Sequence, residues 1–150
     1  MLAPLLAIVL VAHAPPELSS GPPPVPPGVR LRSADAAFEE RRFPARAREA
    51  LEGYRELVRH NPNDPSLGWR FAMASQVVGH RVTTDSEEKA RLFQEGRDAA
   101  LAALALDPKC APCHFWAGIN MALYGETIGI LKMLFTLGAV RELLRKAAAL

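Results

Sequence analysis

The sequence has almost no excess of one charge: 18 Lys and Arg residues stand against 16 Asp and Glu residues, for a net charge of +2. The basic residues are mixed with acidic ones, as in "FEERRFPARAREALEGYREL". A protein that binds nucleic acid needs Lys and Arg clustered on one face without neutralising neighbours. The charge pattern therefore argues against nucleic acid as a partner and favours solvated helix faces with ion pairs between neighbouring turns.

The chain also lacks short motifs that mark common catalytic sites. It contains no G-x-S-x-G turn, which exposes the nucleophile of many serine hydrolases, and no glycine-rich phosphate loop. The acidic residues Asp85, Glu87 and Glu88 fall at the expected start of a helix, where carboxylates are electrostatically favoured. They predict helix capping rather than catalysis or metal binding. We therefore expect a protein that is not an enzyme, with no catalytic residues and no metal site.

The N-terminal apolar run is too short to predict a membrane span, which needs about 20 residues. It extends from Leu2 to Ala12 and ends in an Ala-His-Ala triplet, as is typical of a secretory signal peptide. We predict that residues 1–14 direct export to the periplasm. The alternative is an uncleaved N-terminal anchor, which would then be the only part of the chain associated with a membrane.

A proline-rich segment follows the apolar run, with seven prolines between Pro15 and Pro27. Because proline fixes φ and removes a backbone donor, residues 15–29 are expected to form a stiff, extended linker. The rest of the chain, residues 30–150, has room for one folded domain.

Two segments of this domain align without gaps. "NPNDPSLGWRFAMASQVVG" covers residues 61–79, and "DPKCAPCHFWAGINMALYG" covers residues 107–125. Each begins with Asn-Pro or Asp-Pro, continues with an apolar helical pattern, ends in glycine and follows an amphipathic helix. Proline ends the preceding helix and glycine is expected to close the following one. The pattern predicts two related helix pairs.

These helix pairs resemble the tetratricopeptide repeat. The small-aromatic-apolar-proline pattern of its second helix is matched by Ala50, Tyr54, Leu57 and Pro62. Ala72 and Gly118 occupy the small-residue position of its first helix, where the two helix axes approach most closely. The resemblance implies an all-α fold of antiparallel helix pairs stacked as an α-solenoid. The resemblance covers roughly residues 33 to 150 and implies that residues 30–150 form a tetratricopeptide-like repeat domain.

The spacing departs from that family, whose period is about 34 residues. Pro62 and Pro108 are 46 residues apart. The extra residues fall in "HRVTTDSEEKARLFQEG", so we predict a long insertion between the first and second helices of the pair. Thr84 and Glu87 suggest a capping box for a long helix that begins near Ser86. The last unit, "ETIGILKMLFTLGAVRELLRKAAAL", is expected to hold two helical pieces separated at Gly138.

The long insertion, together with "GILKMLFTLGAVRELLRKA" after "HFWAGINMALYG", is similar to the periplasmic tetratricopeptide family known as the TatT component of TRAP transporters. This resemblance implies a non-enzymatic protein that associates with a periplasmic solute-binding protein and presents a groove lined by its helices. The alternative is a general envelope assembly scaffold. "LLRKAAAL" is a poor polar cap for a solenoid. We therefore expect either that later repeats are missing at the C-terminus or that another subunit of a homo-oligomer covers this face.

Only two cysteines occur, and both lie in "CAPCHFW" at residues 110–116. Cys-x-x-Cys-His is the attachment signature of haem c, in which Cys110 and Cys113 would form thioethers and His114 would bind the iron. The repeat alignment explains the same positions without a haem, with Cys113 at a small-residue position and His114 at a packing position. We therefore favour a disulfide or an unreactive thiol pair and no cofactor, and keep haem c as the alternative. Zinc would lack a fourth ligand.

In such solenoids the first helix of each pair lines the concave surface, and several of its residues are candidates for a ligand or partner groove. Trp69, Trp116 and Tyr124 are aromatic residues on these helices. Asn120 is a polar residue among apolar ones, one turn from Trp116, and is the best single candidate for a ligand contact. The alternative for Asn120 is a satisfied hydrogen bond between helices.

Overall fold

The computed structural model describes residues 26–150, so the predicted signal peptide and most of the predicted linker lie outside the described residues. Within this range the regular secondary structure is entirely α-helical, which confirms the predicted all-α class. The helices are α1 (Pro27–Glu39), α2 (Pro44–His60), α3 (Pro65–Arg81), α4 (Ser86–Leu106), α5 (Ala111–Ile128) and α6 (Ile130–Ala149). Helix α1 begins three residues before the predicted boundary at Arg30. None of the helices in residues 26–150 is both long and apolar enough to cross a membrane.

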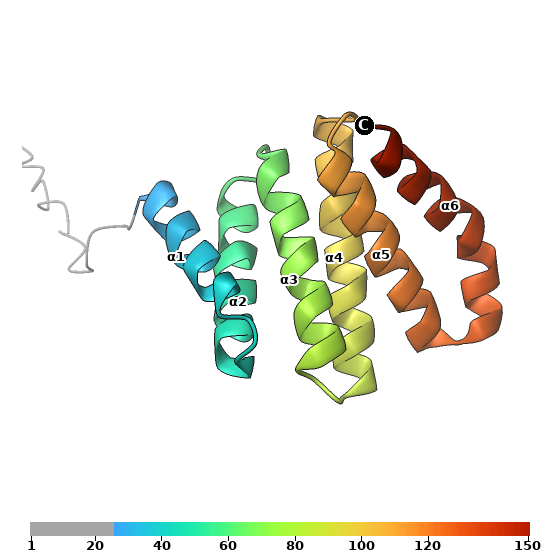
Figure 1. The fold of residues 1–150 in the computed structure, drawn as a ribbon, viewed down its shortest axis with the longest axis horizontal. Helices are drawn as coiled ribbons and strands as arrows, with labels where there is room; N and C mark the ends of the chain where they lie inside the picture. The colour runs from blue at the N-terminus through green and yellow to red at the C-terminus, as the bar shows by residue number, and fades with distance from the viewer. Residues whose placement is uncertain (1–25) are drawn as a thin grey trace, which may run out of the picture.

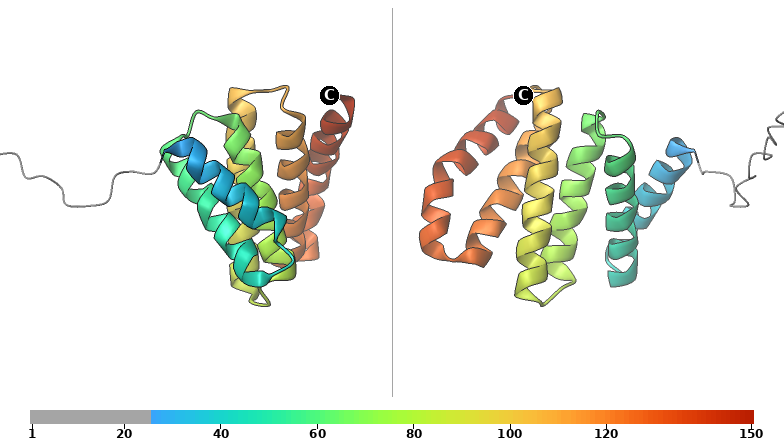
Figure 2. Two further views of the ribbon diagram at one scale, coloured as in Figure 1. Left: turned by 60° about the vertical axis from the view of Figure 1, so that its left-hand side comes forward. Right: turned by 180° about the vertical axis from the view of Figure 1, so that it is seen from behind.

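The helices lie side by side in chain order, and consecutive helices run in opposite directions (Figure 1). Packing joins α1 to α2, α3 to α4 and α5 to α6, and these pairs are connected by α2 against α3 and α4 against α5. Helix α3 also contacts α5 directly. Views from the side and from behind show the same order, from α1 at one end to α6 at the other (Figure 2).

Proline and aspartate define where most of these helices begin. Helices α1, α2, α3 and α5 have proline in the first turn, where its fixed φ suits the helix and its missing N–H is not needed. Asp64 caps α3 by accepting a hydrogen bond from the Ser66 amide at 2.9 Å. Asp85 caps α4 by accepting one from the Glu88 amide at 2.7 Å. The cap of α4 is therefore Asp85 rather than the predicted Thr84, although the helix begins at Ser86 as expected.

No long insertion separates α3 from α4, in contrast to the prediction. Only residues 82–85 connect the two helices, and only Gly129 stands between α5 and α6. The extra residues lengthen the helices, since α4 has 21 residues. A continuous helix satisfies its own backbone hydrogen bonds, whereas a long loop would need other partners for them.

The glycines predicted to end helices have other roles. Helix α3 continues past Gly79 to Arg81, and α5 continues past Gly125 to Ile128. A Cβ at Gly79 would lie 2.6 Å from Cε1 of Phe93, so this glycine allows α4 to approach closely. The predicted break at Gly138 is wrong, because α6 is continuous there. The break falls at Gly129, whose φ of 113° is a conformation that favours glycine.

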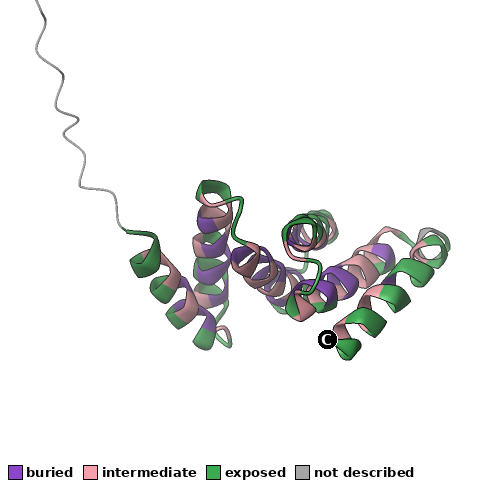
Figure 3. Cartoon of the chain, turned by 90° about the horizontal axis from the view of Figure 1, so that it is seen from above, coloured by how far each residue is buried: buried purple, intermediate pink, exposed green. Residues whose placement is uncertain are grey.

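Most of the large buried side chains belong to α1 through α4. Their cluster includes Phe38, Tyr54, Phe71 and Leu92. A second, smaller cluster joins Ala72, Ala100 and Ala117, with partly buried Leu104, Trp116 and Leu143 packed around them. Buried residues follow the faces on which neighbouring helices meet, while the outer side of α6 is largely exposed (Figure 3).

Polar contacts tie the first four helices together. The Tyr54 hydroxyl on α2 donates a hydrogen bond of 2.7 Å to Oδ1 of Asp35 on α1. Nε of Arg70 on α3 lies 3.6 Å from the same carboxylate oxygen. Burial and the bond to Asp35 raise the pKa of Tyr54 well above its usual value, so the phenol stays protonated. This contact joins three helices.

Two ion pairs in matching register bridge α2 and α4 across α3. Arg48 binds Glu88 at 2.7 Å, and Arg55 binds Glu95 at 2.8 Å. Both arginines and both glutamates are seven residues apart on their helices, so the pairs repeat at two helical turns. They align α2 with α4 although the two helices share little direct packing.

Candidate functional site at the start of helix α5

The turn between α4 and α5 positions the two cysteines. Asp107 ends α4, and its side chain accepts a hydrogen bond from the Lys109 amide at 3.0 Å. Its carbonyl oxygen accepts another from the Cys110 amide at 3.1 Å. Cys110 is then the N-cap of α5, and its Sγ accepts a hydrogen bond from the Cys113 amide at 3.2 Å. The sequence therefore places one cysteine just before the helix and the other in its first turn.

Cys110 and Cys113 form a disulfide with a Cα–Cα distance of 5.2 Å. The two sulfur atoms have different surroundings. Cys110 is half-buried, whereas Cys113 is 0% exposed and its Sγ lies 3.8 Å from the carbonyl oxygen of Pro65 at the start of α3. Because the bond closes a loop of only four residues, its entropic stabilisation of the fold is expected to be roughly 2 kcal/mol.

His114 is turned into the protein beside this disulfide. Its side chain is buried, and Nε2 lies 2.9 Å from the carbonyl oxygen of Pro108, which accepts a hydrogen bond from it. Nδ1 is buried without a hydrogen-bond partner in the described part of the chain. Attachment of haem c would need two free thiols and an imidazole facing an open space. In this structure the two sulfurs are bonded to each other and the imidazole is buried.

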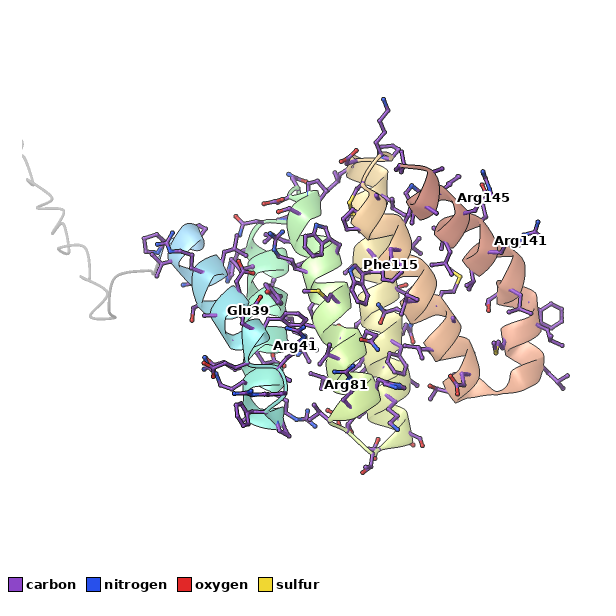
Figure 4. All side chains as sticks on the ribbon, viewed as in Figure 1. Glu39, Arg41, Arg81, Phe115, Arg141 and Arg145 are labelled. Carbon is purple, nitrogen blue, oxygen red and sulfur yellow. A yellow bond between two sulfur atoms is a disulfide. The ribbon has the colours of Figure 1, made fainter. Side chains whose placement is uncertain are left out.

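A groove lies next to the disulfide, between the first half of α5 and the last turns of α6. Its volume is about 620 Å³. It is lined by Ala111, Pro112, Phe115, Trp116, Leu144, Ala147 and Ala148. The rings of Phe115 and Trp116 pack edge to face with their centroids 5.0 Å apart. Phe115 is exposed on α5, while Arg141 and Arg145 lie on the outer side of α6 (Figure 4). The lining is apolar and ends at the residues between the two cysteines.

The structure does not bring together the four residues predicted to line a groove. Trp116 alone among them lines the groove of α5 and α6. Trp69 is half-buried on α3 with the Arg70 guanidinium 4.4 Å from its ring centre. Tyr124 lies further along α5, with the Arg97 guanidinium 5.1 Å from its ring centre. These aromatic residues pack against arginines of their neighbourhood.

Asn120 lies on the face of α5 that contacts α3. It is fully buried, and its Nδ2 donates to the carbonyl oxygens of Ala72 at 3.0 Å and Trp116 at 2.9 Å. The bond to Ala72 links α5 to α3. A polar side chain on the contact face between two helices gains most by bonding the neighbouring backbone, which was the alternative interpretation of this residue.

Sequence reasoning missed the half of the groove that α6 supplies. Leu144, Ala147 and Ala148 follow the i, i+3, i+4 spacing of one helix face, and this pattern is visible in "LLRKAAAL". The predicted break at Gly138 and the predicted loss of later repeats did not assign this helix face to a groove. Earlier in α6, the apolar segment divides: Met133 and Val140 pack inward, whereas Leu131, Leu134 and Phe135 are exposed.

The other cavities and side-chain groups of the described residues are weaker candidates for a functional site. A cavity of about 420 Å³ between α1 and α2 is lined by Val29, Arg30, Ser33, Ala34, Glu49, Gly53 and Glu56. It mixes opposite charges and contains no aromatic or nucleophilic group beyond one serine. Within residues 26–150, no three His, Cys, Asp or Glu side chains are grouped so that they could hold a metal ion. We therefore take the start of α5 and its groove as the candidate site.

Comparison with protein families matches residues 30–150 to the family described as "RMD1-3: Regulator of microtubule dynamics protein 1-3". No curated protein and no solved structure matches the chain. The family match covers α2 to α6 in full and nearly all of α1, so it includes both cysteines and the whole groove.

Proposed function

This chain belongs to the RMD1-3 family of regulators of microtubule dynamics, and from that premise we propose that it is a non-enzymatic binding protein for a protein partner. The groove between α5 and α6 holds an apolar segment of that partner. The observation that carries this proposal is the groove itself, an apolar surface with an aromatic pair at its wall. Aromatic residues in concave apolar sites supply much of the binding energy in protein interfaces.

Part of the proposal is that the helix pairs α3–α4 and α5–α6 are repeat units of a tetratricopeptide-like solenoid. Aligned positions in α3 and α5 support it, because they are buried in both helices. Leu67 aligns with Cys113, Phe71 with Ala117, and Ala74 with Asn120, and all six are buried. A small residue also recurs at the helix contact, where a Cβ at Gly118 would lie 3.0 Å from Leu144. Equivalent burial at a spacing of 46 residues is what a stacked repeat requires.

The family description makes the microtubule the first partner to test. The resemblance to the TatT family of TRAP transporters instead predicts a periplasmic solute-binding protein, and an envelope assembly role predicts other exported proteins. These proposals share one binding surface and differ in the partner. The groove can therefore be tested separately from the identity of its occupant.

The test uses a matched pair of charge substitutions on exposed alanines. Ala148→Asp places a carboxylate in the groove, whereas Ala102→Asp places one on the exposed side of α4. In co-sedimentation with polymerised tubulin, the unsubstituted chain and Ala102→Asp should pellet equally. Ala148→Asp should lose about tenfold or more in affinity, because a buried unpaired charge costs more than 1.4 kcal/mol.

Two outcomes would count against the proposal in different ways. If the unsubstituted chain does not pellet, tubulin is not the partner, and the same pair of variants is then compared with a periplasmic solute-binding protein. If Ala148→Asp binds as tightly as Ala102→Asp, the groove is not the binding surface.

A further inference from the structure

The Cys110–Cys113 disulfide combines three features at one place. It lies at the N-terminus of an 18-residue helix, its two cysteine residues differ in exposure, and Pro112 between them forms part of the apolar groove. We propose that this disulfide is a thiol–disulfide exchange site for cysteine-containing peptide segments. The exchange reaction goes beyond the binding role proposed above, and only the preference for apolar peptides rests on that role.

Cys110 is the sulfur that an incoming thiolate attacks. It is half-buried at the helix end, whereas Cys113 is fully buried against the start of α3. In the disulfide form, Sγ of Cys110 accepts a hydrogen bond from the Cys113 amide at 3.2 Å. In the reduced protein, the same hydrogen bond would stabilise a thiolate at Cys110. The positive end of the α5 dipole also favours a negative charge there. The geometry therefore makes Cys110 the accessible sulfur for attack, the better leaving group when the mixed disulfide is resolved, and the better nucleophile in the reduced protein.

A purely structural role explains the disulfide less well. Cross-links that close long loops restrict the unfolded chain most, and this one joins residues only three apart in sequence. The start of α5 is held independently of the bond. Pro112 sets the backbone of its first turn, and His114 bonds to the carbonyl oxygen of Pro108. Reduction can therefore proceed without loss of the helix.

The reaction balances with a peptide dithiol as the co-reactant. One peptide thiolate attacks Sγ of Cys110, a bond forms between these two sulfurs, and the Cys110–Cys113 bond breaks. Its electron pair goes to Cys113, which takes up a proton. The second peptide thiolate then attacks the peptide sulfur of the mixed disulfide and releases Cys110 as a thiolate. The peptide is oxidised by two electrons to a disulfide, and the protein is reduced to a dithiol.

The groove sets the substrate class. Because Pro112, Phe115 and Trp116 line it directly beside Cys110, a cysteine flanked by apolar residues can place its neighbours in the groove while its sulfur reaches Cys110. A small hydrophilic thiol such as glutathione gains nothing from the groove. The two probes therefore separate exchange chemistry from peptide binding.

The first experiment compares single-cysteine variants of the full chain. Reduced Cys113→Ser, which keeps Cys110, and reduced Cys110→Ser, which keeps Cys113, are each mixed with oxidised glutathione, and adducts are followed by mass spectrometry. Cys113→Ser should form the mixed disulfide at least about tenfold faster, because exposure and thiolate character control the rate. Equal rates would overturn the proposal. So would a Cys113→Ser rate no higher than that of the same variant in urea.

Because Cys113→Ser places a hydroxyl in a buried position, Cys113→Ala serves as a second trapping variant. Circular dichroism tests whether each variant is helical. If neither variant folds, the unsubstituted chain is incubated in glutathione redox buffers. Reduction of its disulfide with retained helicity then supports the proposal, whereas a bond that is reduced only on unfolding overturns it.

The second experiment uses a peptide with leucines on both sides of one cysteine, as its mixed disulfide with thionitrobenzoate, and a matched peptide with glycines. Release of coloured thionitrobenzoate by Cys113→Ser should be about tenfold faster with the leucine peptide. Adding Ala148→Asp should abolish this preference, and adding Ala102→Asp should keep it. If glutathione reacts as expected but the leucine and glycine peptides react at the same rate, exchange at Cys110 is supported and peptide binding in the groove is refuted.

Discussion

Helices α1 to α4 bury large side chains against one another, whereas α6 packs against two glycines of α5, Gly118 and Gly125. The first region contains Phe38, Tyr54 and Phe71 in one cluster. The second cluster, in which α5 takes part, has only three fully buried residues, which are alanines on α3, α4 and α5, and α6 leaves Phe135 91% exposed. Since stabilisation rises by about 25 cal/mol for each Å² of apolar surface buried, the first region is expected to provide most of the stability. The second retains the apolar surface that a binding site needs.

The largest expected effect tests where this stability resides. Tyr54 is 1% exposed, so Tyr54→Ala should lower the free energy of unfolding by about 3–5 kcal/mol, from lost burial and from the lost bond to Asp35. Phe135→Ala removes an aromatic ring of similar size from an exposed position and should change it by less than about 0.5 kcal/mol. Urea denaturation followed by circular dichroism measures both. A comparable loss for Phe135→Ala would show that α6 is covered in solution.

A second pair of substitutions should change stability in opposite directions. Gly79→Ala adds a methyl group 2.6 Å from the Phe93 ring and should destabilise by about 1–3 kcal/mol. The methyl group added by Gly138→Ala has no neighbouring atom of the described residues within 4 Å and lies inside α6, so this substitution should stabilise by up to about 1 kcal/mol. Thermal melts show whether each substitution raises or lowers the stability. Destabilisation by Gly138→Ala would mean that α6 is interrupted there, as the sequence suggested.

The contact between the two regions is expected to have a smaller effect. Asn120→Ala removes the bond from α5 to the Ala72 carbonyl on α3 and should cost about 1–2 kcal/mol. The loss is limited because the substitution also removes Oδ1, a buried oxygen that has no hydrogen-bond partner among the described residues. Hydrogen exchange in α5 and α6 should increase more than in α2. Thr127→Ala is the control, since it removes only a bond within α5 to the Leu123 carbonyl. Equal exchange in all helices of the variant would argue against two separable regions.

The same division explains which features the sequence could predict. Asn/Asp-Pro turns, caps and the helical apolar period are local, so the helices and the start of α4 at Ser86 were predictable. Whether a glycine ends a helix or receives a neighbouring side chain depends on packing that is distant in sequence, and Gly79 and Gly138 were misassigned for that reason. Cys110 and Cys113 indicated the segment in which the candidate site lies. Half of the groove beside them comes from α6, about 30 residues later, and no local pattern joins Trp116 to Leu144.

The smallest expected effect concerns the ion pair that aligns α2 with α4. The hydrogen bond from Arg48 holds the pKa of Glu88 at about 2, below its ordinary value of 4.5. A carboxyl whose pKa is lower in the folded state stabilises the fold above the pKa of the unfolded chain, and this stabilisation is lost as the pH falls toward 2. Both side chains are partly exposed, so solvent screening limits the contribution at neutral pH to about 0.2–1 kcal/mol.

Glu88→Gln should remove this amount at pH 7 and flatten the decrease in stability between pH 4.5 and pH 2, measured by urea denaturation at each pH. Glu87→Gln, at an exposed neighbouring position on the same helix, is the matched control, because it leaves the ion pair of Arg48 and Glu88 in place. If the two variants behave alike, the register of α2 and α4 is maintained by the packing of both helices on α3 rather than by their ion pairs.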